Sequence, residues 1–242
     1  MVCTERLNML RKLSLCSQIL LTGLNVRNAR NMSLAYNKEE IAQLFELFKG
    51  DRMELCVHIA AYYRLRRSEV VGLKWDAVDF ERKTLTIKHK VINDYIDGKE
   101  VIIAEDKLKN ASSRRTLPLI PHIEKLLLEE KQKQEYYMDI LKDGYNMEYK
   151  DYICKDNFGN LITPAFVGDH FRFMIRKHDM RKIRFHDLRH SCASLLLANG
   201  IQMKQIQDWL RHPTYNVTAN FYSHLDYCSK LESAAAMSQI LG

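Results

Sequence analysis

Basic and imidazole side chains are concentrated in one ten-residue stretch of the sequence. Residues 181–190 contain four Lys or Arg side chains and two His side chains. His186 and Arg189 are three residues apart at the predicted start of a helix, so both can face one cleft, and Asp187 is expected to cap this helix. The N-terminus of a helix also favours an anion, because its backbone N–H groups lack partners within the helix. A charge run is most often a solvated face, but this arrangement favours a site for a negatively charged group.

The same stretch has a second interpretation, which is a metal site. His186 and His190 have the i, i+4 spacing of zinc-binding helices. A metalloprotease helix would have a glutamate beside the first histidine, where Asp187 stands here, and no third ligand is obvious. A metal-dependent nuclease that used these histidines and His212 would need a cluster of acidic residues, which the sequence lacks. We therefore expect no metal, and we expect His190 to pack beneath the helix.

Two further segments carry groups of the same kind. Arg64, Arg66 and Arg67 precede a short predicted helix, and His212 precedes Tyr222 by ten residues across a loop that contains proline. A guanidinium is a planar fork of donors that matches phosphate oxygens and stays charged at physiological pH. A tyrosine has an ordinary pKa of about 10 and needs nearby positive charge or a base to act as a nucleophile. These groups suit a phosphodiester, although most tyrosines are packing residues.

The composition agrees with a polyanionic partner. The 242 residues include 37 Lys and Arg against 30 Asp and Glu, for a formal net charge of +7. A hydrophobic content of 46% excludes a disordered or collagen-like chain. Six cysteines without a Cys-x-x-Cys pair indicate neither a disulfide framework nor a thiolate metal site, and they fit a reduced cytoplasm. The apolar stretch at 13–24 is too short and too polar for a membrane span.

Helical patterns dominate the sequence on both sides of a short stretch of strands. Asn37 and Glu40 form a capping signal for a helix that ends at Gly50, a second helix is predicted over 52–63, and Ser68 is expected to cap a third. A long polar helix is predicted over 121–142. Residues from Pro164 onward are helical, with predicted breaks at three places: Lys182, Gly200 and the His212–Pro213 step.

Three segments predict a small antiparallel sheet between these helical blocks. They are 84–89, where polar and apolar residues alternate, 101–104 and 115–119. A turn at 156–159 indicates a short hairpin at best. Because strands and helices do not alternate as in βαβ units, the predicted fold class is α+β, mostly helical with a small antiparallel β-sheet.

Four motifs, taken in their order and spacing, resemble the catalytic domain of tyrosine recombinases, the phage integrase family. They are Arg66 in Leu-Arg-Arg-Ser-Glu, His186-x-x-Arg189 in His-Asp-Leu-Arg-His, Leu210-x-His212, and Tyr222 in Phe-Tyr-Ser-His. Within the family the sequence is most similar to integrases of conjugative transposons and phages of Gram-positive bacteria, through residues 112–119, 186–194 and 224–227.

The resemblance implies cutting and rejoining of DNA through a covalent 3′-phosphotyrosyl intermediate, without a metal or other cofactor. Tyr222 would attack the scissile phosphate, while Arg66 and Arg189 would hold its non-bridging oxygens and stabilise the transition state. His186 would assist proton transfer from the tyrosine, and His212 would donate a hydrogen bond to the phosphate.

The resemblance also implies a lysine that protonates the departing 5′ oxygen from a β-hairpin. Lys109 fits its register best, and Lys107 is the alternative. Glu69 would support the first arginine. The residues expected to contact DNA are Arg64, Arg67, Lys107, Arg184 and Arg211.

The sequence departs from the family pattern at two glycine positions, which Arg64 and Arg211 occupy. Glycine at such turns allows a positive φ or a close approach of the backbone, so these arginines are expected to strain the loops or crowd the phosphate. A catalytically impaired DNA-binding fragment of an integrase is therefore the alternative function.

The resemblance implies the following domain organisation. Residues 36–242 form the catalytic domain, residues 1–35 are an extension of uncertain structure, and the core-binding domain that closes a clamp around DNA is expected to be absent. The expected partner is a double-stranded DNA attachment site, in the cytoplasm and without a membrane. The last predicted helix, 226–241, either closes the core or packs on a neighbouring protomer in a homo-oligomer on DNA.

Overall fold

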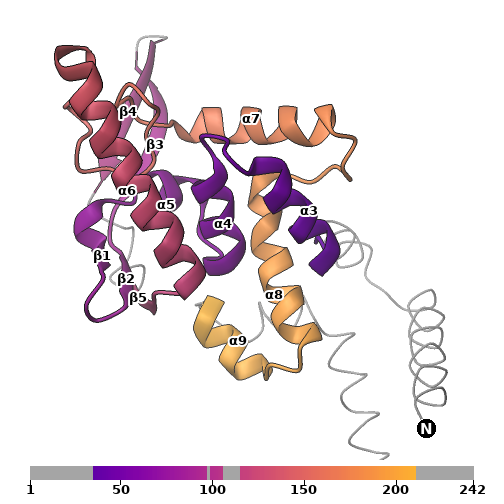
Figure 1. Cartoon of the computed structure of the whole chain (residues 1–242). Coiled ribbons are helices and arrows are strands. Elements are labelled where there is room, and N and C mark those ends of the chain that lie inside the picture. The colour runs from indigo at the N-terminus through magenta and orange to yellow at the C-terminus, as the bar shows by residue number, and fades with distance from the viewer. Residues whose placement is uncertain (1–34, 97–98, 106–114, 211–242) are drawn as a thin grey trace, which may run out of the picture. The chain divides into compact units, whose positions relative to one another are not determined.

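The computed structural model describes residues 35–96, 99–105 and 115–210 (Figure 1). The chain divides into two compact units, of which Leu34–Gly200 is the larger. Helix α9 (Met203–Leu210) belongs to the other unit, and within it Ile206 is buried. Several predicted features lie outside the described residues: Lys107, Lys109, Arg211, His212, Tyr222, the helix at 226–241, and the extension apart from its last residue.

The first described helix, α3 (Lys38–Phe48), begins as its sequence predicts. The Asn37 side chain accepts a hydrogen bond from the N–H of Glu40 at 2.8 Å, and the Glu40 carboxylate accepts one from the N–H of Asn37 at 2.8 Å. This reciprocal capping box pairs two N–H groups that the helix itself leaves without partners. Leu44 and Phe48 are fully buried on one face, and Gly50 ends the turn with a φ of 75°.

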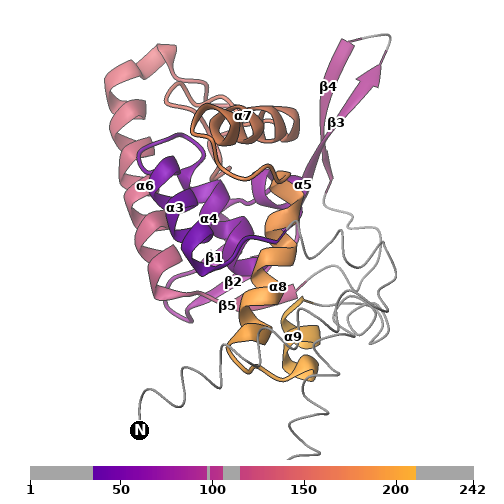
Figure 2. The ribbon, with the colours of Figure 1, turned by 90° about the vertical axis from the view of Figure 1, so that its right-hand side faces the viewer.

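Helix α4 (Glu54–Tyr63) lies at the centre of the unit. Seven consecutive residues, from Leu55 to Ala61, are buried, as is Tyr63. A helix that is apolar on all sides requires neighbours on all sides, and α4 packs against α3, α5, α6 and α8. Figures 1 and 2 show it between these helices. The segment that follows α4, from Arg64 into α5, therefore starts from a rigid position.

The predicted sheet exists as the three-stranded antiparallel order β1-β2-β5. Its strands are β1 (Val78–Asp79), β2 (Thr84–Ile87) and β5 (Arg115–Pro118). In β2 the alternation predicts the burial, because Leu85 and Ile87 are inaccessible to solvent while the threonines between them are not. Leu85 pairs with Leu117, which fixes the register of β5.

The expectation of a single sheet was wrong, because 101–104 belongs to a second one. Strand β4 (Lys99–Glu105) pairs with β3 (Lys90–Ile96) in a separate antiparallel ribbon, which Figure 2 shows extending away from the helices. The sequence did not predict β3, because its central Asn93 and Asp94 have low strand propensity. The base of β3 packs against α5 and α7.

The short helix α5 (Arg67–Val71) starts two residues earlier than a cap at Ser68 would place it. Ser68 lies inside the helix, so its predicted role as a cap was wrong. The N–H of Arg66, at the cap position, instead donates to the Glu69 carboxylate at 3.0 Å. A glutamate at the third helical position can reach back in this way, and it competes effectively with a serine cap.

The remaining helices follow the prediction closely. Helix α6 (Pro121–Leu141) has its proline in the first turn, and α7 (Pro164–Lys177) is capped by the Thr163 hydroxyl, which accepts from the N–H of Phe166. The break predicted at Lys182 spans 178–184. Within the described ranges, three short 3₁₀ turns join the elements: η1 (Trp75–Ala77), η3 (Lys142–Gly144) and η4 (Phe185–Asp187), the last leading directly into α8 (Leu188–Ala198).

Two smaller expectations are also met. Gly200 follows α8 with a φ of 77°, the left-handed stop that the sequence predicts. An isolated bridge between Lys155 and Leu161 closes the short hairpin around the predicted turn. Over the described part of the chain, we find no helix that combines the length and the apolar character needed to cross a bilayer.

Replacing Phe48 with alanine should lower the free energy of unfolding by about 3 to 5 kcal/mol, because the ring is fully buried and the site has little room to collapse. The Phe48 ring stacks on Phe171 at 5.7 Å between centroids. Urea unfolding followed by circular dichroism measures the change. The matched control is Phe173→Ala on α7, whose side chain is 47% exposed. Equal losses in the two variants would contradict this description of the core.

Candidate functional site

The segment with the densest basic residues is anchored by apolar side chains on both sides of His186. Phe185 in η4 is buried with its ring edge-to-face against Phe171 at 5.4 Å, and Leu188 at the start of α8 is fully buried. These anchors leave His186 exposed and Arg189 half-buried. His186 lies in η4, just before the helix rather than in it, and Arg189 lies in the first turn of α8.

Asp187 has a different role from the predicted one. Its side chain makes no capping bond to α8; instead Oδ2 accepts from the backbone N–H of Arg184 at 2.8 Å and closes the η4 turn. The Arg184 guanidinium adds two further hydrogen bonds to the same carboxylate. Burial alone would raise the pKa of Asp187, but these bonds outweigh it and lower the pKa. Arg184 remains 73% exposed, so its contact with DNA stays a prediction.

Arg189 lies among three other guanidinium groups. Burial lowers the pKa of Arg189 to about 9, and the positive charges of Arg64, Arg66 and Arg115 add to this effect, while Glu69 opposes it. Such a pKa is unusual for arginine, whose ordinary value exceeds 12. The shift means that the cationic state is disfavoured by its surroundings. A bound anion would relieve this repulsion, so the arrangement is suited to hold one.

A buried glutamate holds two of these arginines in place. Glu69 is 2% exposed, and its Oε2 accepts from the backbone N–H of Arg66 and from Nη2 of Arg115, both at 3.0 Å. Its Oε1 lies 3.5 Å from Nη1 of Arg66. Burial alone would raise the pKa of Glu69, but the Arg115 charge and these hydrogen bonds lower it further than burial raises it. The carboxylate therefore stays ionised between the two guanidinium groups.

Arg115 is the residue of this cluster that the sequence reasoning missed. Its side chain is only 13% exposed although it lies on the short strand β5. The one sequence signal is its place in an Arg-Arg-Thr run directly before the apolar end of a strand. Its role depends on the pairing of Arg115 with Ile87 across β2 and β5, which the sequence alone does not specify.

The two histidines of this segment are both less basic than ordinary histidine. Partial burial of the imidazole is the main cause that lowers the pKa of His186, although the residue keeps some contact with solvent. The guanidinium groups around it act in the same direction, and Asp187 opposes them. Burial likewise lowers the pKa of His190 to about 4. Their rings are nearly perpendicular with centroids 6.2 Å apart. Among the described residues no three His, Cys, Asp or Glu side chains are grouped to hold a metal.

Arg64 has a left-handed backbone conformation, which favours glycine. It ends α4 with a φ of 55° and a ψ of 33°, in the left-handed region. This conformation costs a residue with a side chain roughly 1 to 2 kcal/mol. The side chain is directed inward, because Arg64 is 7% exposed and its charge lowers the pKa of both Arg189 and His186. Arg64 therefore adds positive potential to the cluster from the protein interior.

Arg67 points to a different neighbour. Its Nη1 lies 2.5 Å from the position that a Cβ on Gly168 would occupy, so the guanidinium lies against α7 where glycine leaves room. Arg67 is exposed, and its contact with DNA stays a prediction. Of the predicted site residues that the structure describes, it brings together Arg64, Arg66, His186 and Arg189, with Arg67 and Arg184 at other positions.

Residues 36–228 match the model of the phage integrase family. The chain belongs to this family. The family's XerC-like tyrosine recombinase of Caldanaerobacter subterraneus is 29% identical over 197 residues, which are 78% of this chain and 50% of that protein. The ICEBs1 integrase of Bacillus subtilis is 27% identical over 214 residues, 85% of this chain and 54% of that protein. The resemblance given by the motifs is thereby confirmed.

The fold is also that of the family. The integrase of transposon Tn1549, solved with circular intermediate DNA, superimposes with a TM-score of 0.68 at 19% identity, covering 87% of this chain and 67% of that one. The α+β class with small antiparallel sheets is confirmed. This chain spans about half the length of the curated relatives that it matches.

The variant Glu69→Gln should lose about 2 to 3 kcal/mol of stability at pH 7, because two guanidinium groups lose their charged acceptor. The folded-state pKa of Glu69 lies below the unfolded value of roughly 4.3, so the stabilisation is present above that pH and is lost as the pH falls through the folded pKa. The difference between wild type and variant should therefore shrink below pH 4 in urea titrations. The exposed Glu39→Gln is the control, and a difference independent of pH would contradict this role.

Proposed function

We propose that this chain is the catalytic part of a site-specific tyrosine recombinase that cuts and rejoins DNA through a 3′-phosphotyrosyl intermediate. The observation that carries the proposal is the cluster that the Arg189 guanidinium forms with three others, in a chain of the integrase family. Their mutual repulsion suits them to a phosphodiester, whose charge increases as the fifth oxygen approaches phosphorus. Residues 36–242 form this catalytic domain.

The backbones that carry the two arginines are well defined. The N–H of Arg66 is held by the Glu69 carboxylate, which also lies 3.5 Å from its guanidinium, and Arg189 lies in the first turn of α8. Donors that are already oriented stabilise the transition state without a reorganisation cost. Arg66 and Arg189 bind the non-bridging oxygens, and Arg64 and Arg115 increase the positive potential behind them.

His186 serves as the proton acceptor of the reaction. Because its pKa is lowered, the imidazole is neutral near pH 7 and can take the proton of the Tyr222 hydroxyl. The tyrosine oxygen forms a bond to phosphorus as the bond to the 5′ oxygen breaks. That oxygen leaves with a proton from Lys109, or from Lys107 if the hairpin register is shifted, and His212 donates a hydrogen bond to the phosphate.

The partner of this reaction is a double-stranded DNA attachment site. The similar Tn1549 integrase was solved in complex with circular intermediate DNA, which supports this choice. Arg67, Arg184 and Arg211 would contribute phosphate contacts, and the protein would act in the cytoplasm. The segment 226–241 would join protomers into a homo-oligomer on the DNA.

A nicked suicide substrate tests the proposal directly. Incubation with wild type should give a covalent protein–DNA adduct on a denaturing gel, because the nick lets the 5′ end diffuse away before rejoining. Tyr222→Phe should give no adduct while its DNA affinity stays within about twofold, since the nucleophilic oxygen alone is removed. An adduct that persists in Tyr222→Phe would refute the assignment of Tyr222.

The backbone of Arg64 supports a second candidate, a silent DNA-binding module derived from such an enzyme. A left-handed arginine costs stability and places a charge where glycine stands in the family. This candidate predicts salt-sensitive DNA binding, through release of counterions, without an adduct. The double variant Arg64→Gly with Arg211→Gly separates the two functions. An adduct in wild type supports the recombinase, and an adduct only in the double variant supports the silent module.

A further inference from the structure

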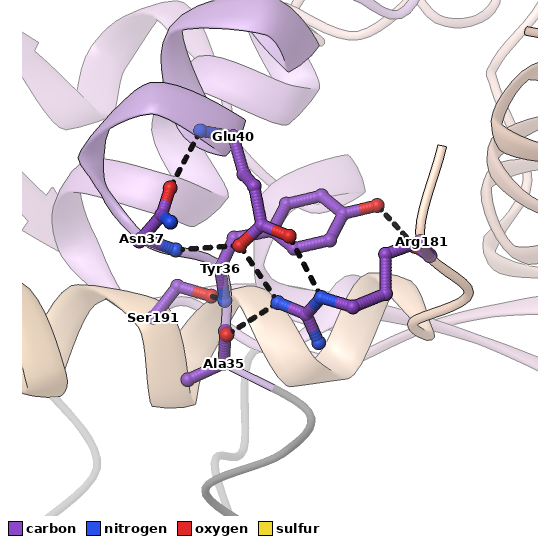
Figure 3. Close-up of polar contacts among 6 residues, drawn as sticks. All are labelled: Ala35, Tyr36, Asn37, Glu40, Arg181 and Ser191. Carbon is purple, nitrogen blue, oxygen red and sulfur yellow. Dashed lines mark hydrogen bonds and ion pairs between the residues drawn. The ribbon is translucent and has the colours of Figure 1, made fainter. Parts of the chain in front are cut away.

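Tyr36 connects the two ends of the segment that carries His186 and Arg189. Its hydroxyl donates to the carbonyl oxygen of Arg181, and its backbone N–H donates to Oγ of Ser191 at 2.8 Å (Figure 3). Tyr36 is 1% exposed and Ser191 is fully buried. Burial raises the pKa of Tyr36 to about 12, so its hydroxyl remains a neutral donor at physiological pH. Tyr36 thus contacts both ends of the eleven-residue segment 181–191, which comprises a loop, η4 and the start of α8.

An ion pair between Arg181 and Glu40 reinforces the connection that Tyr36 makes to Arg181. Nε and Nη2 of Arg181 donate to the two carboxylate oxygens of Glu40 at 2.7 and 2.8 Å, and Nη2 also donates to the carbonyl of Ala35 at 2.6 Å. The Arg181 guanidinium lies over the Tyr36 ring at 4.9 Å. Figure 3 shows these contacts around one side chain. We call Tyr36, Glu40, Arg181 and Ser191 the clasp.

The segment closed by the clasp has few bonds of its own. Residues 180–184 are neither helix nor strand, so no regular hydrogen-bond ladder fixes their path. Two buried side chains, Ile183 and Phe185, and the Asp187 turn provide the rest of the support. Irregular backbone of this kind opens locally unless side chains fix it. The clasp is therefore placed to determine where His186 and Arg189 stand.

We propose that the clasp is a positioning device that aligns His186 and Arg189 with the scissile phosphate and ties that alignment to the chain that enters the domain at Ala35. The inference rests on the proposed function. Because Ala35 accepts a hydrogen bond from Arg181 directly, a displacement of the chain at this point moves Arg181 and the segment behind it. Tyr36, Glu40 and Arg181 are positioning residues, since they act through His186 and Arg189.

Arg181→Ala tests the clasp in the full chain. The adduct should form about tenfold more slowly at saturating protein, because a misplacement near 1 Å is enough for losses of this size, while DNA affinity changes less than twofold. The matched control is Arg172→Ala, which removes an arginine from an exposed pair with Asp169. The conservative variant Arg181→Lys, which keeps a cationic donor for the Glu40 carboxylate and the Ala35 carbonyl, should recover part of the lost rate. Equal rates in Arg181→Ala and wild type would overturn the proposal, as would a rate in folded Arg181→Lys no higher than that in Arg181→Ala.

A second measurement does not depend on DNA chemistry. In the NMR titration of the folded chain, the pKa of His186 should rise toward its ordinary value in Arg181→Ala and Tyr36→Phe, because a looser ring is better hydrated. A role in stability alone would leave this native-state pKa unchanged, and that result would overturn the clasp. If wild type forms no adduct but the His186 titration responds, the clasp is supported and the proposed recombinase function fails.

Discussion

The interaction on which the site depends is the buried carboxylate of Glu69 between two guanidinium groups. Four arginines cannot share one small region without repulsion, and their charges add to the burial that lowers the pKa of Arg189 to about 9. Glu69 offsets part of it and binds the backbone of Arg66 at the same time. The remaining excess of positive charge stays unneutralised within the protein. That excess positive charge is what makes the region suited to a phosphate. Glu69, which holds the arginines together, contributes no reacting atom itself.

The fold brings this cluster together from three distant segments. The buried helix α4 ends in the left-handed turn at Arg64 and leads into α5, so Arg64 and Arg66 are placed by the centre of the core. The pairing of β5 with β2 delivers Arg115, and the packing of α8 against α4 delivers Arg189. The clasp then adjusts the segment before α8, where regular hydrogen bonding is missing. Rigid helices thus supply coarse placement, and side-chain contacts supply the final alignment.

Local signals in the sequence predicted most elements correctly, and the failures have two causes. The capping box of α3, the proline that opens α6 and the glycine stop after α8 depend on neighbours within four residues. Ser68 and Asp187 were assigned as caps by the same local logic. The Glu69 carboxylate, however, accepts from the N–H at the start of α5, and the Asp187 carboxylate accepts from the N–H and the guanidinium of Arg184 instead of capping α8. Strand β3 was missed because its pairing with β4, rather than its own composition, makes it a strand.

The sequence alone determined the family, and it predicted the chemical types of the site: arginines, histidines and a tyrosine in a spacing that suits a phosphodiester. Such motifs are legible because each consists of residues close in the chain. The tertiary structure decided which charges meet. Only the β2–β5 pairing makes Arg115 a member of the cluster, only the inward turn at the end of α4 buries Arg64, and only the approach of residues 35–40 to Arg181 and Ser191 forms the clasp. Electrostatic energy depends on distance in space, which sequence separation does not report.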